Sequence, residues 1–258
     1  MPESAASLLV RIIRCPVAGR CMAGEDLAYS AVVRSQEASG PGDFQVPEPW
    51  SGHISRAPVL FVSSNPSIDP HEVYPAGDWD EDRRIDFFAG RFDQRDLPWI
   101  DQRMRPLLQT FPPQHRDHGT RFWAATRARA SELLGRPAEP SRDFALTEVV
   151  HCKSRAEHGV KEALATCAGT WLRPTIHVAA APVVVLFGTR AQRAFCDTFA
   201  IPAHAPVTGP LSIECTDRIV VQLPHPNARS QRRNCYPLTS SQLDQVRRYL
   251  HTHQHLAS

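Results

Sequence analysis

Short apolar runs alternate with longer helical patterns along most of the chain, and this alternation constrains the fold more than any other feature. Four runs have the length and composition of buried strands, namely Ala57–Val62, Phe144–Val150, Val183–Phe187 and Arg218–Leu223. Helical patterns lie between and after them, at Arg121–Leu134, Val160–Ala180, Thr189–Phe199 and Ser240–His251. This order predicts a mostly parallel four-stranded sheet with helices on both faces, a three-layer α/β/α sandwich.

The chain of 258 residues fits one domain with two additional segments. Residues 1–56 are predicted as an N-terminal arm, because residues 35–57 are rich in Gly, Pro, Ser and acidic residues and have no sustained periodicity, which is typical of a loop. The main domain spans residues 57–258. Within it, residues 69–119 form a long segment with many aromatic residues, which we interpret as a lid or an insertion subdomain.

The composition indicates a soluble globular protein, with 42% hydrophobic, 22% charged and 8% aromatic residues. No apolar run reaches the ~20 residues that a membrane helix needs. Arginines interrupt the apolar stretch Ser7–Arg14, which makes it a poor secretory signal. Seven cysteines scattered over a long chain favour reduced thiols or metal ligands over a disulfide framework. We therefore expect a cytoplasmic protein.

Two turn-forming loops directly follow predicted strands. Ser64-Asn65-Pro66-Ser67 follows the first strand and His225-Pro226-Asn227 follows the last. In this kind of fold the ligand site lies outside the carboxyl ends of the strands, where both loops are expected. Each loop in isolation is more often a simple turn. Their shared position favours a functional role for Asn65 and His225.

Three segments, taken in order, resemble the uracil-DNA glycosylase superfamily, most closely its bacterial and archaeal members that carry an iron-sulfur cluster. Val59–Ser67 is similar to the first motif, a buried strand that runs into a Gly-x-Asn/Asp-Pro-Gly-type turn. Leu223–Asn227 resembles the His-Pro-Ser motif. The middle region of strand, cysteine, helix, strand and glycine turn is similar to Leu146–Cys152, Cys167 and Val183–Ala191. The resemblance covers residues 57–250 and implies excision of a base from DNA.

Cleavage of an N-glycosidic bond passes through an oxocarbenium-like sugar and a departing base anion. The enzyme therefore has to hold a water near the sugar and to stabilise negative charge on the base. We expect the Asn65 amide to orient the water, while Pro66 stiffens the turn that carries it. We expect His225 to donate a hydrogen bond to a base carbonyl. Ser64 and Pro66 are expected to line the base site.

An enzyme that acts on a base in duplex DNA extrudes the base and stacks it against a ring. Phe87 and Phe88 are candidates for that ring, with Tyr74 behind them. The alternative is that these aromatic residues pack the insertion itself.

A basic stretch follows the His225 loop. Asn227, Arg229, Arg232 and Arg233 are candidates for the wedge and the phosphate contacts beside the flipped nucleotide. The alternative is a solvated basic loop. Because the formal net charge of the chain is only +2, any DNA-binding surface has to be a local patch.

The position that recognises the base departs from the family pattern. In the resembling families an asparagine four residues before the cysteine binds the uracil edge, which presents one donor and one acceptor, but this chain has Glu148 there. A carboxylate only accepts hydrogen bonds and would repel uracil O4, whereas a protonated carboxyl, favoured by burial, imitates the amide. Two hypotheses stay open: a neutral Glu148 that binds uracil, or an ionised Glu148 that selects a base with an exocyclic amine.

Four cysteines are candidates for the ligands of a [4Fe–4S] cluster. Cys152 and Cys167 match the ligand pair that flanks a helix in the resembling families, and Cys15 and Cys21 can supply the other two thiolates. Cys15 and Cys21 are farther apart than the family's Cys-x-x-Cys, so buried free cysteines without any cofactor are the alternative. A zinc site built from the same cysteines has no spacing in its favour. The remaining cysteines, Cys196, Cys215 and Cys235, are not expected to bind the cluster.

The sequence thus predicts a monofunctional DNA glycosylase that removes uracil or another deaminated or modified base and leaves an abasic site, as in base excision repair. One alternative is a glycosylase retuned to a non-uracil base, for example in defence against modified foreign DNA. Another is a non-catalytic DNA-binding or damage-sensing relative, although the presence of both Asn65 and His225 favours the enzyme. DNA is the expected partner, and the nucleoid is the expected location.

Overall fold

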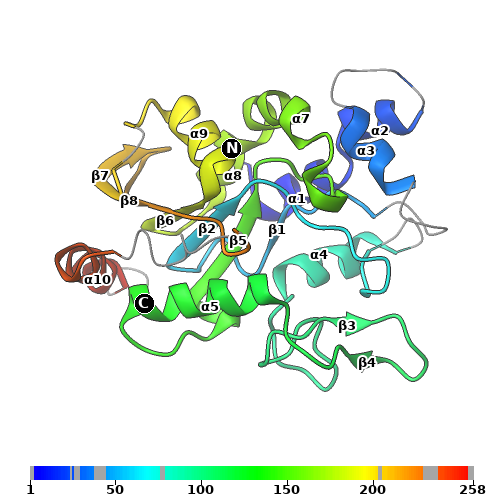
Figure 1. Ribbon diagram of the computed structural model, residues 1–258, viewed down its shortest axis with the longest axis horizontal. Helices are drawn as coiled ribbons and strands as arrows, with labels where there is room; N and C mark the ends of the chain where they lie inside the picture. The colour runs from blue at the N-terminus through cyan, green and yellow to red at the C-terminus, as the bar shows by residue number, and fades with distance from the viewer. Residues whose placement is uncertain are drawn as a thin grey trace.

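The computed structural model describes residues 3–23, 25, 30–37, 45–75, 79–202, 205–228 and 238–254, and a six-stranded mixed sheet lies at its centre (Figure 1). The strand order is β1-β5-β2-β6-β8-β7. The four middle strands run parallel, and they are β5 (Phe144–Glu148), β2 (Val59–Ser63), β6 (Val183–Phe187) and β8 (Thr216–Leu223). They confirm the four predicted strands.

Two antiparallel edge strands were not predicted. β1 (Trp50–Ser51) pairs with β5, and β7 (Val207–Ile213) pairs with β8. β1 is too short to leave a pattern in the sequence. Gly209 and Pro210 interrupt β7, where the pairing register shifts between Thr208 and Leu211, and such an interruption is tolerated in an edge strand.

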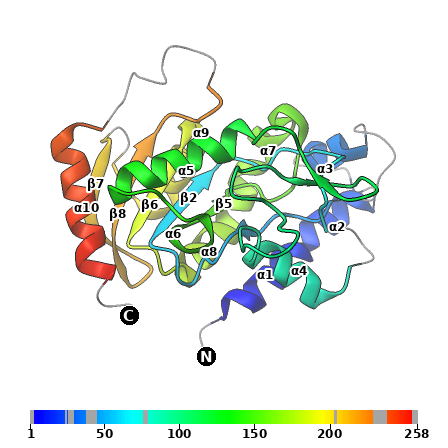
Figure 2. The same ribbon diagram turned by 90° about the horizontal axis from the view of Figure 1, so that it is seen from below.

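Helices cover both faces of the sheet, which confirms the three-layer α/β/α sandwich (Figures 1 and 2). Successive side chains of a strand point to opposite faces. Val59 and Phe61 of β2 pack in the same cluster as α5 (Arg121–Leu134) and α10 (Ser240–Gln254). Leu60 and Val62 pack on the other face, whose layer contains α1 (Ala5–Ile13), α7 (Val160–Cys167), α8 (Arg173–Val178) and α9 (Gly188–Phe199).

The helix predicted at residues 160–180 consists of three segments. α7 continues into a π-helical segment, η2 (Ala168–Leu172), and then into α8. Pro174 lies at the start of α8 and has no N–H to donate to the preceding turn. The wider turn of η2 therefore occurs directly before a residue that cannot continue the regular hydrogen-bond pattern.

The first 56 residues contribute both helices and core side chains. α1 is followed by α2 (Pro16–Met22) and α3 (Ser30–Glu37), so the predicted loop at residues 35–57 is wrong for its first three residues. Leu8, Leu9 and Ile12 of α1 are fully buried in the core, where α1 contacts α8 and α4. Burial of this apolar face fixes α1 against the domain.

The segment predicted as an insertion has its own short elements. They are α4 (Glu81–Ala89), β3 (Leu107–Leu108) and β4 (Gln114–His115), and the last two form a small antiparallel pair. Further along the chain, α6 (Pro140–Asp143) leads into β5, and the 3-10 turn η1 (Arg155–Glu157) follows it. Within the described ranges, no helix combines the length and the apolar character that crossing a membrane would require.

Candidate active site

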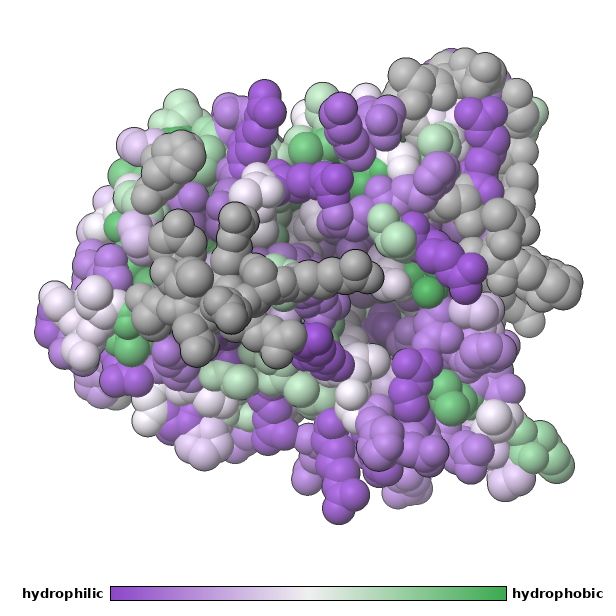
Figure 3. All heavy atoms as spheres, in the orientation of Figure 1, coloured by the Kyte–Doolittle hydropathy of each residue, from purple (hydrophilic) through white to green (hydrophobic). Residues whose placement is uncertain are grey.

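A cavity of about 1230 Å³ lies at the carboxyl ends of the parallel strands. Segments that follow β2, β5, β6 and β8 form its walls, together with the start of α5 and part of the insertion. Figure 3 shows this face of the molecule hollowed near its centre and largely hydrophilic around the hollow. Six of the site residues predicted from the sequence line the cavity: Ser64, Asn65, Pro66, Glu148, His225 and Asn227.

Hydrogen bonds hold the Asn65 amide in one orientation. Its Nδ2 donates to the backbone carbonyls of Val150 (3.3 Å) and Cys152, and its Oδ1 accepts from the Ser154 hydroxyl at 2.7 Å. This network determines which end of the amide is oxygen. One lone pair of Oδ1 is left for a water in the cavity.

His225 faces the cavity as a neutral imidazole. The backbone N–H of Asn227 donates to Nδ1 at 3.1 Å, so the ring proton lies on Nε2. Burial lowers the pKa of His225 below its ordinary value of 6.5, which keeps the ring neutral at pH 7. Phe122 of α5 stacks on this ring, with 5.6 Å between the ring centroids. The Nε2–H group is therefore positioned as a hydrogen-bond donor.

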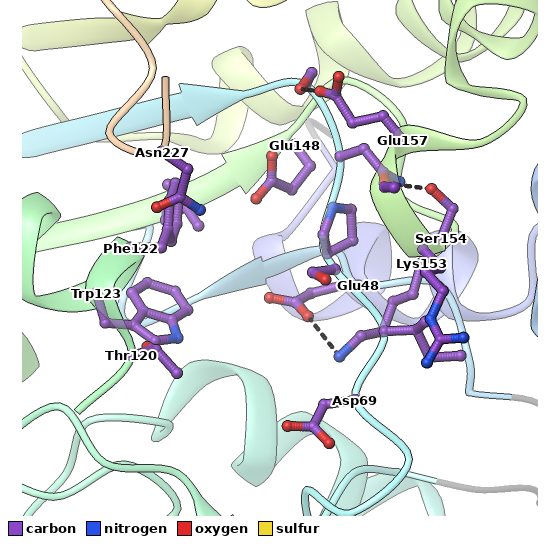
Figure 4. Close-up of a pocket in the computed structure, with 18 of the residues that line it drawn as sticks. Glu48, Asp69, Thr120, Phe122, Trp123, Glu148, Lys153, Ser154, Glu157 and Asn227 are labelled. Atoms are coloured by element: carbon purple, nitrogen blue, oxygen red, sulfur yellow. Dashed lines mark hydrogen bonds and ion pairs between the residues drawn. The ribbon is translucent and has the colours of Figure 1, made fainter. Parts of the chain in front are cut away.

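Glu148 ends β5 beside Ser63, its register partner on β2, and is only 4% exposed. Burial, and then the negative charge of Glu48, raise the pKa of Glu148 well above its ordinary value of 4.5. Its Oε2 has no hydrogen-bond partner among the described residues, and Figure 4 shows the carboxyl group directed into the cavity. These observations favour the hypothesis of a neutral Glu148 over that of an ionised one.

Four buried charged residues, Glu48, Glu72, Arg91 and Lys153, line the cavity beside Glu148, and we call them the buried charge cluster. Arg91 Nη1 lies 3.5 Å from Glu48 Oε2, and Arg91 Nη2 donates to Glu72 Oε1. Burial raises the pKa of Glu48, but the charges of Arg91 and Lys153 outweigh burial and lower it, so Glu48 is ionised. Sequence reasoning missed the cluster because only the fold brings its members together.

Glu157 is a further cavity residue that the sequence did not reveal. Its carboxylate accepts hydrogen bonds from the Ser64 hydroxyl and from the Arg190 guanidinium. Ala156 and Glu157 have φ angles of 51° and 57°, in the left-handed region, which costs a non-glycine residue about 1–2 kcal/mol. Such conformations concentrate at functional sites. The strained turn brings a carboxylate next to the Asn65 loop.

The aromatic residues predicted to stack on a base do not lie in the cavity. Phe87 and Phe88 are fully buried, Tyr74 is 3% exposed, and none of the three lines the cavity. Their rings pack against one another with centroid distances of 5.1 to 5.8 Å. They therefore pack the interior of the insertion, which was the alternative to stacking on a base. Phe122 and Trp123 are aromatic rings that do line the cavity.

The predicted DNA contacts are described only in part. Asn227 is exposed at the cavity beside Ala228, whereas Arg229, Arg232 and Arg233 lie outside the described residues. Two other exposed arginines, Arg121 and Arg155, also line the cavity. Arg121 and Arg155 therefore place positive charge at the cavity in addition to any contribution from the basic stretch that follows His225.

The four candidate cluster cysteines share one buried region. Cys15, Cys21 and Cys152 are buried, Cys167 is half-buried, all four pack in the same core cluster, and all are free thiols. Burial raises the pKa of Cys152 well above its ordinary value of 9.0, and the nearby sulfurs of Cys167, Cys15 and Cys21 raise it further. The four sulfurs therefore lie near one another. Cys196 is buried and Cys215 exposed, and Cys235 lies outside the described residues.

The four cysteines have the donor chemistry that a [4Fe–4S] cluster needs. In the part of the chain that the structure describes, no three His, Cys, Asp or Glu side chains stand close enough to hold one metal ion. The thiolates of a [4Fe–4S] cluster bind four different irons, so they stand farther apart than the ligands of a single zinc ion. Four neighbouring cysteines in reduced form are the ligands that such a cluster takes.

Two comparisons with known proteins bear on the identity of the chain. A search among curated proteins found no match. The family model described as "Uracil DNA glycosylase superfamily" matches residues 49–251, well over half of the chain, and this range includes the sheet, the Asn65 loop and the His225 loop. The chain therefore belongs to the uracil-DNA glycosylase superfamily.

Proposed function

We propose that the protein is a DNA glycosylase that hydrolyses the N-glycosidic bond of uracil, or of another base with a uracil-like edge, and leaves an abasic site. Membership of the superfamily indicates glycosylase activity on DNA. One observation carries the proposal: Asn65 and His225 line the same cavity, and within the described residues one lone pair of Asn65 Oδ1 and the Nε2–H of the neutral His225 have no partner. Each supplies one of the two groups that the reaction needs.

In the proposed reaction the electron pair of the glycosidic C–N bond passes to the departing base. The Nε2–H of His225 donates to the base carbonyl oxygen on which negative charge develops. Asn65 Oδ1 orients a water whose oxygen forms the new bond to C1′ of the sugar. The proton lost by that water passes to solvent or to the departing base. Because a water and not an amine attacks C1′, the enzyme is monofunctional.

The neutral Glu148 indicates the edge of the base that binds. A protonated carboxyl presents an O–H donor and a carbonyl acceptor side by side. The N3–H and O4 groups of uracil are complementary to this pair, as are the N1–H and O6 groups of hypoxanthine. An ionised Glu148 would offer two acceptors and would suit a different set of bases.

Oligonucleotides that carry uracil, hypoxanthine, xanthine or modified cytosine, in single- and double-stranded form, test the proposal. Abasic sites are converted to strand breaks with alkali, and breaks are expected only after this treatment. Asn65→Ala and His225→Ala are each expected to lower the rate ~100- to 1,000-fold. His177→Ala, a histidine substitution outside the cavity, is the matched control and should keep full activity. The proposal is wrong if the folded wild-type protein releases none of these bases.

We also propose that Cys15, Cys21, Cys152 and Cys167 hold a [4Fe–4S] cluster. The support is their shared buried position and their reduced state. When bound, the cluster would act as a structural link. Cys15 and Cys21 flank and lie in α2, whereas Cys152 follows β5 and Cys167 ends α7, so such a link would join the N-terminal helices to the segment that anchors Asn65.

Iron and sulfide analysis of anaerobically purified protein tests the cluster. We expect about four irons and four sulfides per chain in the wild type, and their loss in Cys152→Ala. Cys215→Ala is the matched control, because Cys215 is exposed and outside the group of four, and it should keep the metal. Stoichiometric zinc, or metal-free folded protein, would contradict the assignment.

A further inference from the structure

Lys153 carries a buried ammonium group that donates no hydrogen bond within the described part of the chain. Its side chain is 2% exposed, and its Nζ lies 3.7 Å from Glu48 Oε2 and 4.0 Å from Glu72 Oε2, beyond hydrogen-bond distance. The ring centre of Tyr74 lies 3.7 Å from the same atom. Lys153 lines the cavity. The two ion pairs and the ring hold the ammonium group in place, but none of its N–H groups has a hydrogen-bond acceptor at close range within the described residues, so they can donate to a ligand in the cavity.

Lys153 and Glu148 lie at the same end of the cavity. Glu48 pairs with the Lys153 ammonium, and the negative charge of Glu48 also acts on Glu148. Figure 4 shows the Lys153 side chain reaching to Glu48, with the Glu148 carboxyl directed into the adjacent space. Glu148 Oε2 and the Nε and Nη1 atoms of Arg91 are also buried there without hydrogen-bond partners among the described residues. This end of the cavity is therefore prepared for a polar ligand.

A neutral Glu148 alone does not distinguish uracil from cytosine. The proton of a carboxyl group resides on either oxygen, so the group offers its donor and its acceptor in either order. One order matches the N3–H and O4 of uracil, and the other matches the N3 and the exocyclic amine of cytosine. Hypoxanthine and adenine present the same ambiguity. Discrimination therefore needs a second group that cannot exchange donor for acceptor.

An ammonium group has this property, because it donates hydrogen bonds and never accepts them. We propose that Lys153 is a specificity-determining residue that donates to a carbonyl oxygen of the extruded base. The site then accepts bases with a carbonyl at this position, such as uracil and hypoxanthine, and rejects cytosine and adenine, which have an amine there. The inference rests on the proposed glycosylase function and extends it by naming the residue that selects a carbonyl over an amine at this position of the base.

The first test compares kcat/KM for uracil and for cytosine in matched oligonucleotides. In the wild type we expect a strong preference for uracil. Lys153→Met should reduce the ratio of the two values about 10- to 100-fold, as expected for the loss of a hydrogen bond from a charged donor. Lys153→Arg should restore part of the preference. Lys161→Met, which changes a lysine outside the cavity, is the matched control and should leave the ratio unchanged.

Removal of the Lys153 charge leaves Glu48 with one cation fewer, so Lys153→Met can fail to fold. The double variant Lys153→Met with Glu48→Gln removes both charges and serves in its place. Thermal unfolding establishes that each variant is folded. A purely structural role for Lys153 would lower activity on every base in proportion and would leave the uracil-to-cytosine ratio unchanged.

A binding measurement separates this inference from the proposed function. Fluorescence anisotropy is used with oligonucleotides that carry 2′-fluoro-2′-deoxyuridine or 2′-fluoro-2′-deoxycytidine, in which the fluorine slows bond cleavage. Tighter binding of the uracil analogue, lost in Lys153→Met, supports the inference even if no base is excised. If a folded Lys153 variant keeps the wild-type ratio of uracil to cytosine, the inference about Lys153 is wrong, but the proposed glycosylase function is not affected. The inference is also wrong if the wild-type protein excises uracil and cytosine with equal kcat/KM and binds the two fluorinated analogues equally well.

Discussion

Glu48 and Glu148 are neighbouring buried carboxyl groups whose pKa values shift in opposite directions. Burial raises the pKa of both, but Arg91 and Lys153 outweigh it at Glu48, whereas at Glu148 the charge of Glu48 adds to it. At any pH between the two pKa values, Glu48 is therefore ionised while Glu148 is neutral. Environments that separate the pKa values of paired acids are a common way to give identical groups different roles. Here Glu48 pairs with Lys153, and the carboxyl group of Glu148 faces the cavity.

The raised pKa of Glu148 predicts an alkaline limit to uracil excision. Below that pKa the carboxyl is neutral and matches uracil, and as the pH rises through it the group ionises and repels O4. Glu148→Gln carries the same donor and acceptor without titrating, so the variant should excise uracil and should lack this limb. The measurement is kcat/KM against pH for both proteins. Parallel profiles on the alkaline side would contradict a titrating Glu148.

Site residues differ in how far the sequence could predict them. Asn65 and His225 follow strands, and strand ends in a parallel sheet converge, so their position was predictable. Phe87 and Phe88 were misplaced because their residue type gives hydrophobicity but not the direction of the side chain. Glu48 and Lys153 are far apart in sequence and meet only through the fold, so no local pattern marks them.

At the scale of elements, Gly188 at the start of α9 lies close to His225. Gly188 has a φ of +80°, and a Cβ at this position would lie 3.1 Å from the His225 Cβ. Gly188→Ala is expected to lower the free energy of unfolding by about 1–2 kcal/mol through backbone strain. By displacing His225, it should also lower the excision rate for every base alike.

Urea denaturation and single-turnover rates measure the two effects of Gly188→Ala. Gly169→Ala is the control, because a Cβ at Gly169 meets nothing within 4 Å and alanine suits a helical segment better than glycine. That control should keep full activity and lose no stability. Full activity in Gly188→Ala would show that the position of His225 does not depend on the absence of a side chain at residue 188.

The elements themselves were predictable where a hydrophobic period extends over several residues. α5 begins and ends at the predicted residues, β6 is an uninterrupted apolar run, and β2 is apolar up to its last residue, Ser63. α3 extends three residues into a predicted loop, because polar residues hid its end. The sequence 160–180 has a continuous helical pattern, and only hydrogen-bond geometry reveals the π-helical segment within it.

At the scale of the whole molecule, Asp143 ties the α5–α6 connection to the start of β5. Burial raises the pKa of Asp143, but hydrogen bonds from Arg136 and Arg142 outweigh it and lower the pKa from 3.8 to about 2. A depressed carboxyl pKa stabilises the folded state above pH 3.8, and this stabilisation is lost as the pH falls towards 2. Asp143→Asn should therefore cost about 2 kcal/mol at neutral pH.

Urea denaturation of wild type and Asp143→Asn at neutral pH and near pH 2 checks this linkage. The difference between the two proteins should shrink at the lower pH, where the aspartate is about half protonated in the folded state and almost fully protonated in the unfolded state. Asp197→Asn is a suitable control because Asp197 is 73% exposed and should give no measurable difference. A gap that stays constant with pH would exclude a contribution from the Asp143 charge.

A net charge of +2 makes DNA binding depend on individual cations near the cavity. Arg155 is exposed and lines the cavity, so we expect it to contact a phosphate. In Arg155→Ala the slope of log affinity against log salt concentration should become shallower by about one. Anisotropy with an undamaged duplex measures this slope. Arg193→Ala, at an 83% exposed arginine of α9 outside the cavity, should keep the wild-type slope.

The residues that we propose for catalysis and for base recognition lie at the ends of different strands. Asn65 follows β2 and His225 follows β8, whereas Glu148 ends β5 and Lys153 lies just beyond it. The hydrogen bonds of the Asn65 side chain to the segment after β5 involve two backbone carbonyls and the Ser154 hydroxyl, and they do not involve the side chains of residues 148 and 153. A library of variants confined to positions 148 and 153 would therefore sample new target bases while every member keeps the same hydrolytic centre. By the same route, a natural lineage could exchange one target base for another through a few substitutions at a single strand end.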